Sequence, residues 1–378
     1  MSIAFLHTAD WQLGKRFGSF PGDKPAILRN QRLEAVDRLA RAAVDGGCSA
    51  VLVAGDIFDA ETVPQALTSQ LLARLKSYPS LVWHLLPGNH DPARTGGVWT
   101  GILASGLPQN VRVHMQPVAA ELVPGAVVLP APLASKRVAS DPTAWMDDAP
   151  SADGVLRIGL AHGSVQGFGS AGEASVPINP ARVRSAGLAY LALGDWHGTM
   201  RISDHVWYSG TPEPDGFRDN NPGNALIVRV DGAGPPKVEQ VATGNFKWSR
   251  RVLDVGSADA LDVVEQEVAA LGSNAMRSLV SLQLSGGVTL AEFVAIEARL
   301  SALEPALFHL NVNRETLNIV AAETDLGSIA TPVLADIAQR LKLASEAGGD
   351  TASVAQRALH RLFSLAREVE NSEGRAQA

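Results

Sequence analysis

The chain has 378 residues, 46% of them apolar and 19% charged, with a formal net charge of −7. This composition is that of a globular protein long enough for two or three domains. The acidic balance argues against a protein that coats nucleic acid with its whole surface, although a local basic groove remains compatible with it. A single cysteine, Cys48, excludes a disulfide framework and a multi-cysteine zinc site.

The N-terminus lacks the basic start and the long apolar run of a signal peptide. No apolar run has the length needed to span a bilayer. We therefore expect a cytoplasmic protein without membrane association.

The first hundred residues alternate between short apolar runs and amphipathic segments. Apolar runs at 3–7, 51–53 and 81–86 predict buried strands. Apolar residues at spacings of three and four predict helices over 27–45 and 64–78. This alternation indicates βαβ units with parallel strands.

Short β-type runs dominate the following section, together with a polar loop at 134–153, a Gly/Ser-rich segment at 167–175 that we expect to be mobile, and a short helix near 180–186. The predicted strands are 111–115, 118–123, 127–129, 155–161, 190–193, 200–203, 206–209, 225–230 and 238–242. We assign residues 1–245 to one α/β domain.

The pattern changes after residue 245, where no strand end carries a Gly-Asp or Gly-His pair. We expect an α+β domain over 246–345 and a helical tail over 346–378. Thr289 and Glu292 form the capping box of one helix in this domain. The expected helices are 258–271, 289–303, 328–343 and 351–370, and the expected strands are 279–284, 307–312 and 316–320, the last two joined by a turn at 313–315.

Polar residues gather where five predicted strands end. The carboxyl ends of parallel strands are where open α/β sheets place their chemistry. A mixture of carboxylates, a carboxamide and imidazoles suits two adjacent divalent cations, which at about 3.5–4 Å apart stabilise the attacking and leaving oxygens of phosphoryl transfer. A lone Gly-Asp would indicate only a helix-capping turn. The five groups are Asp10/Gln12, Asp56/Asp59, Asn89/His90/Asp91, His162 and Asp195/His197.

The order of these motifs resembles the calcineurin-like metallophosphoesterases. Within that family, residues 6–15 and 208–214 are similar to the SbcD-type DNA-repair exonucleases. The resemblance covers residues 1–245 by motif and implies a β-sandwich flanked by helices. It extends to the second, smaller domain only by position and size, which are similar to those of the nuclease cap domain.

The resemblance also implies roles for single residues. His90 would contact the scissile phosphate and protonate the leaving oxygen, and an anionic Asp59 beside it would orient the imidazole and raise its pKa. Asp56 would bridge the two metals. One metal would be bound by Asp10, Gln12, Asp56 and His197, and the other by Asp56, Asn89, His162 and Asp195.

Two positions depart from the nuclease pattern, because Gln12 and Asp195 stand where histidines are usual. Oxygen donors favour Mn²⁺, or Mg²⁺, over zinc and iron. The extra charge of Asp195 should also weaken the Lewis acidity of its metal and discourage an anionic substrate. The departures bear on nuclease activity more than on metal binding.

Several residues near these motifs admit two interpretations. Lys15, Arg16 and Arg218 could line a phosphate-binding groove or be scattered surface charge. Trp11 and Trp196 could stack a base or pack the ligand loops.

Our first hypothesis is a two-metal phosphodiesterase that acts on DNA ends with an SbcC-like ATPase. One alternative is a small-molecule phosphatase or nucleotide pyrophosphatase. Another is a degenerate nuclease domain kept as a structural partner of the ATPase. By family analogy alone, a homodimer would form through helices near 64–78 and 92–105.

Overall fold

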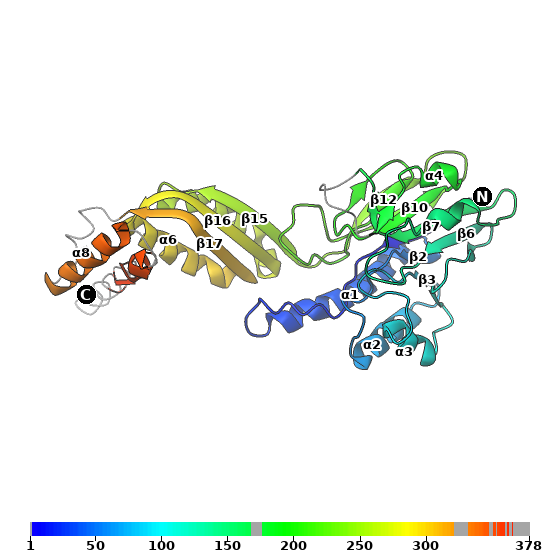
Figure 1. Ribbon diagram of the computed structural model, residues 1–378, viewed down its shortest axis with the longest axis horizontal. Coiled ribbons are helices and arrows are strands. Elements are labelled where there is room, and N and C mark those ends of the chain that lie inside the picture. Colours follow the sequence, from blue (N-terminus) through cyan, green and yellow to red (C-terminus); the bar gives the residue numbers. More distant parts are fainter. Residues whose placement is uncertain are drawn as a thin grey trace. The chain divides into compact units, whose positions relative to one another are not determined.

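The computed structural model describes residues 2–167, 176–320, 332–347 and 351–365, except 353, 360, 363 and 364 (Figure 1). The chain forms two compact units with the boundary between Phe246 and Lys247, and each unit is described by itself. Residues 168–175 of the expected mobile segment and 9 of the 20 residues of the last predicted helix, 351–370, lie outside the described residues. The division of the second unit into a cap and a tail stays a prediction.

Two six-stranded sheets form the first unit, in the orders β14-β13-β1-β2-β3-β4 and β11-β12-β10-β7-β6-β5. Its helices are α1 (Lys24–Asp45), α2 (Gln65–Lys76), α3 (Val98–Ala104) and α4 (Arg182–Ser185), with a 3-10 turn, η1, at Ala144–Asp147. The strands of the first sheet are β1 (Ile3–Thr8), β2 (Ala50–Val53), β3 (Val82–Leu85), β4 (Val111–Val113), β13 (Asn224–Val230) and β14 (Lys237–Ala242). Those of the second are β5 (Ala120–Val123), β6 (Ala126–Ala131), β7 (Leu156–His162), β10 (Tyr190–Gly194), β11 (Met200–Arg201) and β12 (Val206–Tyr208), and β8 (Ser164–Val165) pairs with β9 (Pro177–Ile178).

The sheets pack face to face with helices outside, which confirms the predicted α/β sandwich flanked by helices (Figure 1). Strands β1 to β4 are parallel, as are β6, β7, β10 and β12. Both faces of β1 and β2 are buried, since Leu6 and Val51 meet the helices whereas Phe5 and Leu52 meet the second sheet. Burial on both faces explains why these strands are continuous apolar runs.

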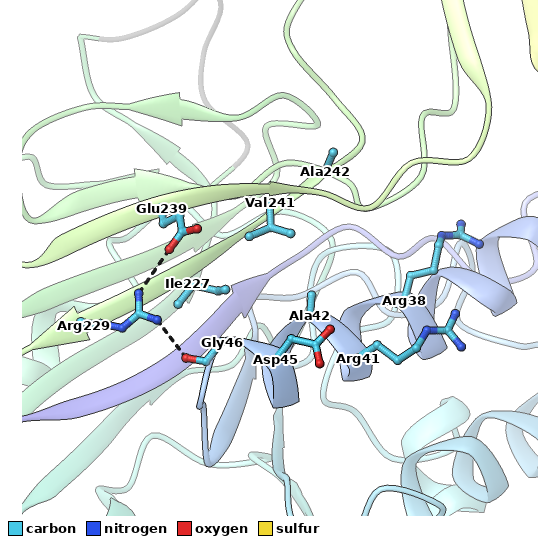
Figure 2. Close-up of a pocket in the computed structure, with 10 residues that line it drawn as sticks. All are labelled: Arg38, Arg41, Ala42, Asp45, Gly46, Ile227, Arg229, Glu239, Val241 and Ala242. Atoms are coloured by element: carbon cyan, nitrogen blue, oxygen red, sulfur yellow. Dashed lines mark hydrogen bonds and ion pairs between the residues drawn. The ribbon is translucent and has the colours of Figure 1, made fainter. Parts of the chain in front are cut away.

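Helix α1 connects β1 to β2 and presents an apolar stripe to the first sheet, including Val36, Leu39 and Ala43. At its C-terminal end, a surface pocket of about 540 Å³ lies between α1 and strands β13 and β14 (Figure 2). Arg229 pairs with Glu239 there and donates a hydrogen bond to the Gly46 carbonyl (Figure 2). None of the residues lining this pocket belongs to the predicted metal site.

The described part of the second unit contains a three-stranded parallel sheet in the order β15-β16-β17. Helices α5 and α6 connect the consecutive strands, and Arg299 on α6 pairs with Asp262 and Glu265 on α5. The predicted capping box of Thr289 and Glu292 is confirmed. The elements are β15 (Lys247–Asp254), η2 (Ala258–Leu261), α5 (Asp262–Leu271), η3 (Gly272–Arg277), β16 (Ser278–Thr289), α6 (Leu290–Leu303), η4 (Glu304–Ala306), β17 (His309–Val320) and α8 (Pro332–Glu346).

The predicted turn at 313–315 is wrong, because β17 runs through these residues without interruption. Gln283 of β16 pairs with Asn313, whereas Ser285 pairs with Thr316, so β17 carries one extra residue at this point. The polar triplet therefore marks a β-bulge rather than a hairpin.

A buried histidine pair joins β3 to the residue after β4. His84 Nδ1 lies 3.0 Å from His114 Nε2, and the rings are stacked. Burial, reinforced by the neighbouring His114 and Arg112, lowers the pKa of His84 to about 3. Burial and Arg112 lower the pKa of His114 to about 4.

This pair should make stability depend on pH. Above about pH 6.5 both histidines are neutral in the folded and in the unfolded chain. Below that pH the histidines of the unfolded chain take up protons first, so the free energy of unfolding falls as the pH drops from 6.5 towards the pKa values of the folded protein. Between pH 7 and 5 each histidine should cost on the order of 2 kcal/mol. Urea unfolding of a His84→Leu/His114→Leu variant should show a correspondingly smaller loss over this range. An equal loss in both proteins would contradict the prediction.

Candidate metal centre

The loops after β1 and β2 remain paired beyond the strand ends. The backbone N–H groups of Asp10, Gln12 and Leu13 donate to the carbonyls of residues 55, 56 and 57 at 2.9–3.1 Å. Asp10, Gln12 and Asp56 have φ angles of 54°, 48° and 53°, in a left-handed region that is costly for residues other than glycine. Uncommon backbone conformations thus coincide with predicted ligands.

Glycines allow the ligand loops to touch. A Cβ atom on Gly88 would lie 2.2 Å from Asp56 Oδ1 and 2.4 Å from the Asp56 backbone nitrogen. A Cβ atom on Gly194 would lie 1.9 Å from the Ala54 carbonyl oxygen. The first contact joins two loops of one sheet, and the second joins loops of opposite sheets.

Asp10, Asp56 and His162 form the centre of the site, with ligand atoms all within 4.8 Å of one another. All three are buried. His162 Nε2 lies 3.4 Å from Asp56 Oδ1 and 3.8 Å from Asp195 Oδ1. The backbone N–H of Asp195 donates to Asp10 Oδ1 at 3.1 Å, so four of the predicted ligands, from β1, β2, β7 and β10, lie together.

The charges of this cluster are strongly coupled. Burial raises the pKa of Asp10 to about 6, although His197 and His162 oppose the rise. Burial acts to lower the pKa of His162, but the carboxylates of Asp56, Asp10 and Asp195 outweigh it and raise that pKa to about 9. Without a cation, protonated His162 is the counter-charge for the carboxylates.

The arrangement fits a divalent cation. His162 Nδ1 faces the Ala54 carbonyl at 2.8 Å, and because a carbonyl can only accept, Nδ1 carries a proton and Nε2 is the atom that faces the carboxylates. His162 Nε2 and Asn89 Oδ1 are both buried without a hydrogen-bond partner among the described residues. Two carboxylates, an amide oxygen and an imidazole nitrogen are donors that Mn²⁺ accepts.

The other predicted ligands lie around this centre. Gln12 Nε2 donates to Asp56 Oδ2 at 2.8 Å, and Asn89 Nδ2 contacts Asp195 Oδ1 at 3.4 Å. His197 Nδ1 lies 3.0 Å from Asp215 Oδ2. Burial acts against the protonated form of His197, but Asp215 and Asp10 raise its pKa.

His90 lies at the edge of the centre, and its side chain is 37% exposed. Its backbone N–H donates to Asp56 Oδ1, and its Nε2 lies 3.9 Å from Asp56 Oδ2. Its Nδ1 faces the backbone carbonyl of Asp59 at 3.0 Å. The expected partner is therefore present, but the hydrogen bond uses the Asp59 carbonyl and not its carboxylate, whose pKa is raised chiefly by burial.

The predicted substrate-binding residues differ in their surroundings. Lys15 Nζ lies 2.5 Å from Asp215 Oδ2, so its charge is already paired. Arg16 and Arg218 are exposed. Trp11 is buried and donates to Thr8 Oγ1, as the packing interpretation predicts, whereas Trp196 is 38% exposed.

Four further residues support the centre, and the sequence predicts a role for none of them. Asp91 is buried and accepts from the backbone N–H groups of Gly88 and Phe58. Buried Arg32 donates to the carbonyls of Asp10 and Trp11. The other two are Ser164, which donates to Asp195 Oδ2 at 2.7 Å, and Asp215. Two of the four carry a signal in the sequence: Asp91 belongs to the polar group at 89–91, and Arg32 is an arginine on the apolar stripe of a helix.

The family follows from a comparison of the sequence with known families. Residues 3–185 match the Calcineurin-like phosphoesterase family. The chain carries a calcineurin-like metallophosphoesterase domain. The family consists of metal-dependent phosphoester hydrolases, and the matched residues contain Asp10, Asp56, Asn89 and His162.

One curated relative is the D subunit of the nuclease SbcCD of Bacillus subtilis (strain 168), which is 31% identical over 151 residues. The match covers 37% of this chain and 37% of that protein, well under two thirds of its length. Among solved structures, TT1561 of Thermus thermophilus is 14% identical, with a TM-score of 0.41 over 64% of this chain and 100% of that chain. Within the described residues, no helix is long and apolar enough to cross a membrane.

The close approach of Gly88 to Asp56 can be tested by adding one methyl group. Gly88→Ala should lower the free energy of unfolding by about 1–3 kcal/mol, because the neighbouring loop must move. Gly101→Ala is the matched control, since its Cβ would meet nothing within 4 Å and α3 favours alanine. Urea unfolding of both variants gives the comparison, and equal stabilities would show that the loops are not in contact.

Proposed function

We propose that this domain hydrolyses phosphodiesters at a divalent metal centre bound by Asp10, Gln12, Asp56, Asn89, His162, Asp195 and His197. The observation that supports this most directly is the cluster of Asp10, Asp56 and His162 at the carboxyl ends of strands from both sheets. A pair of cations, Mn²⁺ or Mg²⁺, would stabilise charge on the attacking and leaving oxygens. The expected cytoplasmic location stays a prediction.

His90 is the proposed general acid. The Asp59 carbonyl at Nδ1 can only accept, so Nδ1 is protonated, and in the imidazolium form the proton that can be given to a leaving oxygen is on Nε2. Nε2 lies 3.9 Å from Asp56 Oδ2, which places it beside the proposed bridging ligand. The Asp59 carbonyl orients the ring, a role that does not need the carboxylate to be ionised.

DNA ends are the proposed substrate, with an SbcC-like ATPase as the proposed partner. Both proposals rest on the likeness to the nuclease chain from Bacillus subtilis and on the motifs at residues 6–15. The pairing of Lys15 with Asp215 removes one of the three residues expected to contact a phosphate backbone. Exposed Arg16 and Arg218 remain the candidates for that contact.

A degenerate structural subunit is the second candidate, and one contact favours it. Gln12 donates its amide N–H to Asp56 Oδ2, the oxygen that would otherwise be free for a cation. A chain that has stopped binding metal could retain such a contact in place of coordination. The two candidates differ in whether the protein binds metal and turns over a diester.

Hydrolysis assays separate the candidates. With Mn²⁺, the native protein should hydrolyse bis-p-nitrophenyl phosphate and linear double-stranded DNA. His90→Ala should reduce the rate by roughly 10²–10⁴-fold, because general acid catalysis contributes about that much. Asp56→Ala should abolish metal binding as well as activity.

The control is Asp219→Asn, which changes an exposed carboxylate outside the proposed site and should leave both rates unchanged. Turnover of the small diester alone would favour a nucleotide-type substrate or a nuclease that needs its ATPase. Absence of turnover with every divalent metal, together with absence of metal binding, would favour the structural subunit.

A further inference from the structure

The buried carboxylate of Asp215 contacts His197 and Lys15, two residues for which the sequence predicts different roles. Asp215 Oδ2 accepts from His197 Nδ1 at 3.0 Å and from Lys15 Nζ at 2.5 Å. The Asp215 side chain is 4% exposed, and that of His197 is 13% exposed. Asp215 Oδ2 thus accepts hydrogen bonds both from a proposed metal ligand, His197, and from a residue predicted to bind substrate, Lys15.

The segment that carries Asp215 is fixed by buried hydrogen bonds. The backbone N–H of Thr211 donates to the His197 carbonyl at 3.0 Å. Arg32 donates to Thr211 Oγ1 and to the Glu213 carbonyl. The same guanidinium donates to the Asp10 and Trp11 carbonyls, so the position of Asp215 is tied to that of the loop after β1.

The Glu213 side chain holds the same segment two residues before Asp215. Its carboxylate accepts from Arg38 at 2.5 Å and from the backbone N–H groups of Asn245 and Phe246 at 2.8 Å. Asp215 therefore follows a segment that is held at residues 211 and 213, and its position does not depend on a surface ion pair alone. A carboxylate fixed in this way can orient a neighbouring imidazole.

We propose that Asp215 is a positioning residue for His197 and that Lys15 positions Asp215 instead of binding substrate. Because the carboxylate accepts from Nδ1, the neutral imidazole carries its proton on Nδ1 and leaves Nε2 available to a cation. The Lys15 ammonium offsets the buried negative charge and restrains the carboxylate. The inference rests on the proposed metal centre and adds a carboxylate–histidine pair to it.

The first test needs no substitution. In protein labelled with ¹⁵N-histidine, long-range ¹H–¹⁵N spectra should show His197 with its proton on Nδ1 and a non-protonated Nε2 at alkaline pH. The His197 signals are assigned by their absence from a His197→Gln variant. A proton on Nε2 would overturn the proposal, whatever the activity of the protein.

The second test measures Mn²⁺ affinity by calorimetry. Asp215→Asn should weaken Mn²⁺ binding by roughly 10–100-fold, the usual effect of losing such a partner. Asp219→Asn, an exposed carboxylate four residues on, should bind as the native protein does. Equal affinity in native and Asp215→Asn proteins would overturn the proposal, whereas a native protein that binds no Mn²⁺ would overturn the proposed function itself.

Lys15→Met separates the two roles of Lys15. If it positions Asp215, the variant should bind Mn²⁺ several-fold more weakly and keep the KM for the diester unchanged. A raised KM with unchanged Mn²⁺ affinity would show that Lys15 contacts the substrate, and would overturn this part of the proposal.

Discussion

The carboxylate of Asp56 is the point on which the ligand loops converge. It accepts hydrogen bonds from the amide of Gln12 and from the backbone N–H of His90, and His162 Nε2 lies 3.4 Å from its Oδ1. Its own backbone is left-handed, and only a glycine at residue 88 leaves room for it. Each neighbour comes from a different strand end, so the position of one side chain sets the spacing of the loops.

Such a cluster needs a positive counter-charge, because several carboxylates are withdrawn from water at once. In the absence of a cation, His162 supplies it, and the carboxylates raise its pKa to about 9. A cation at the same place would replace that proton and meet Asn89 Oδ1, which has no hydrogen-bond partner in the part of the chain that the structure describes. His162, which balances the charge of the carboxylates, is therefore also a residue that would bind the metal.

The sequence predicts the buried strands and the polar residues at their ends for one reason, whereas the sandwich is implied by the family resemblance. Continuous apolar runs identify strands buried on both faces, and the polar residues that end them must lie at one edge of parallel sheets. Asp215 carries no comparable pattern. It accepts hydrogen bonds from Lys15 and His197, and only the folded structure brings these three residues together.

The errors in the second unit have a similar origin. Asn313, Arg314 and Glu315 have the composition of a turn, yet Arg314 pairs with Glu297 of α6 and the strand absorbs the extra residue as a bulge. The sequence does not predict strand β15, because all of its residues are exposed or partly exposed and its charged residues interrupt any apolar alternation. Pairing with β16 defines this strand, and that partner lies well beyond any local window.

Gln12 and Asp195 remain the two departures from the usual ligand set, and each has neighbours suited to it. Asp195 Oδ2 accepts from Ser164, and its Oδ1 lies near the Asn89 amide, so hydrogen-bond donors restrain the added carboxylate. Gln12 can donate from its amide nitrogen to Asp56 and still offer its amide oxygen to a cation. A neutral imidazole can also donate from one nitrogen, but it offers a cation a nitrogen and not an oxygen. The two replacements together make the ligand set richer in oxygen, which is the change expected for a site adapted to Mn²⁺ or Mg²⁺. The contact of Gln12 with Asp56 fits either candidate function, so the Ser164 contact that restrains Asp195 is the one that favours a retained cation site.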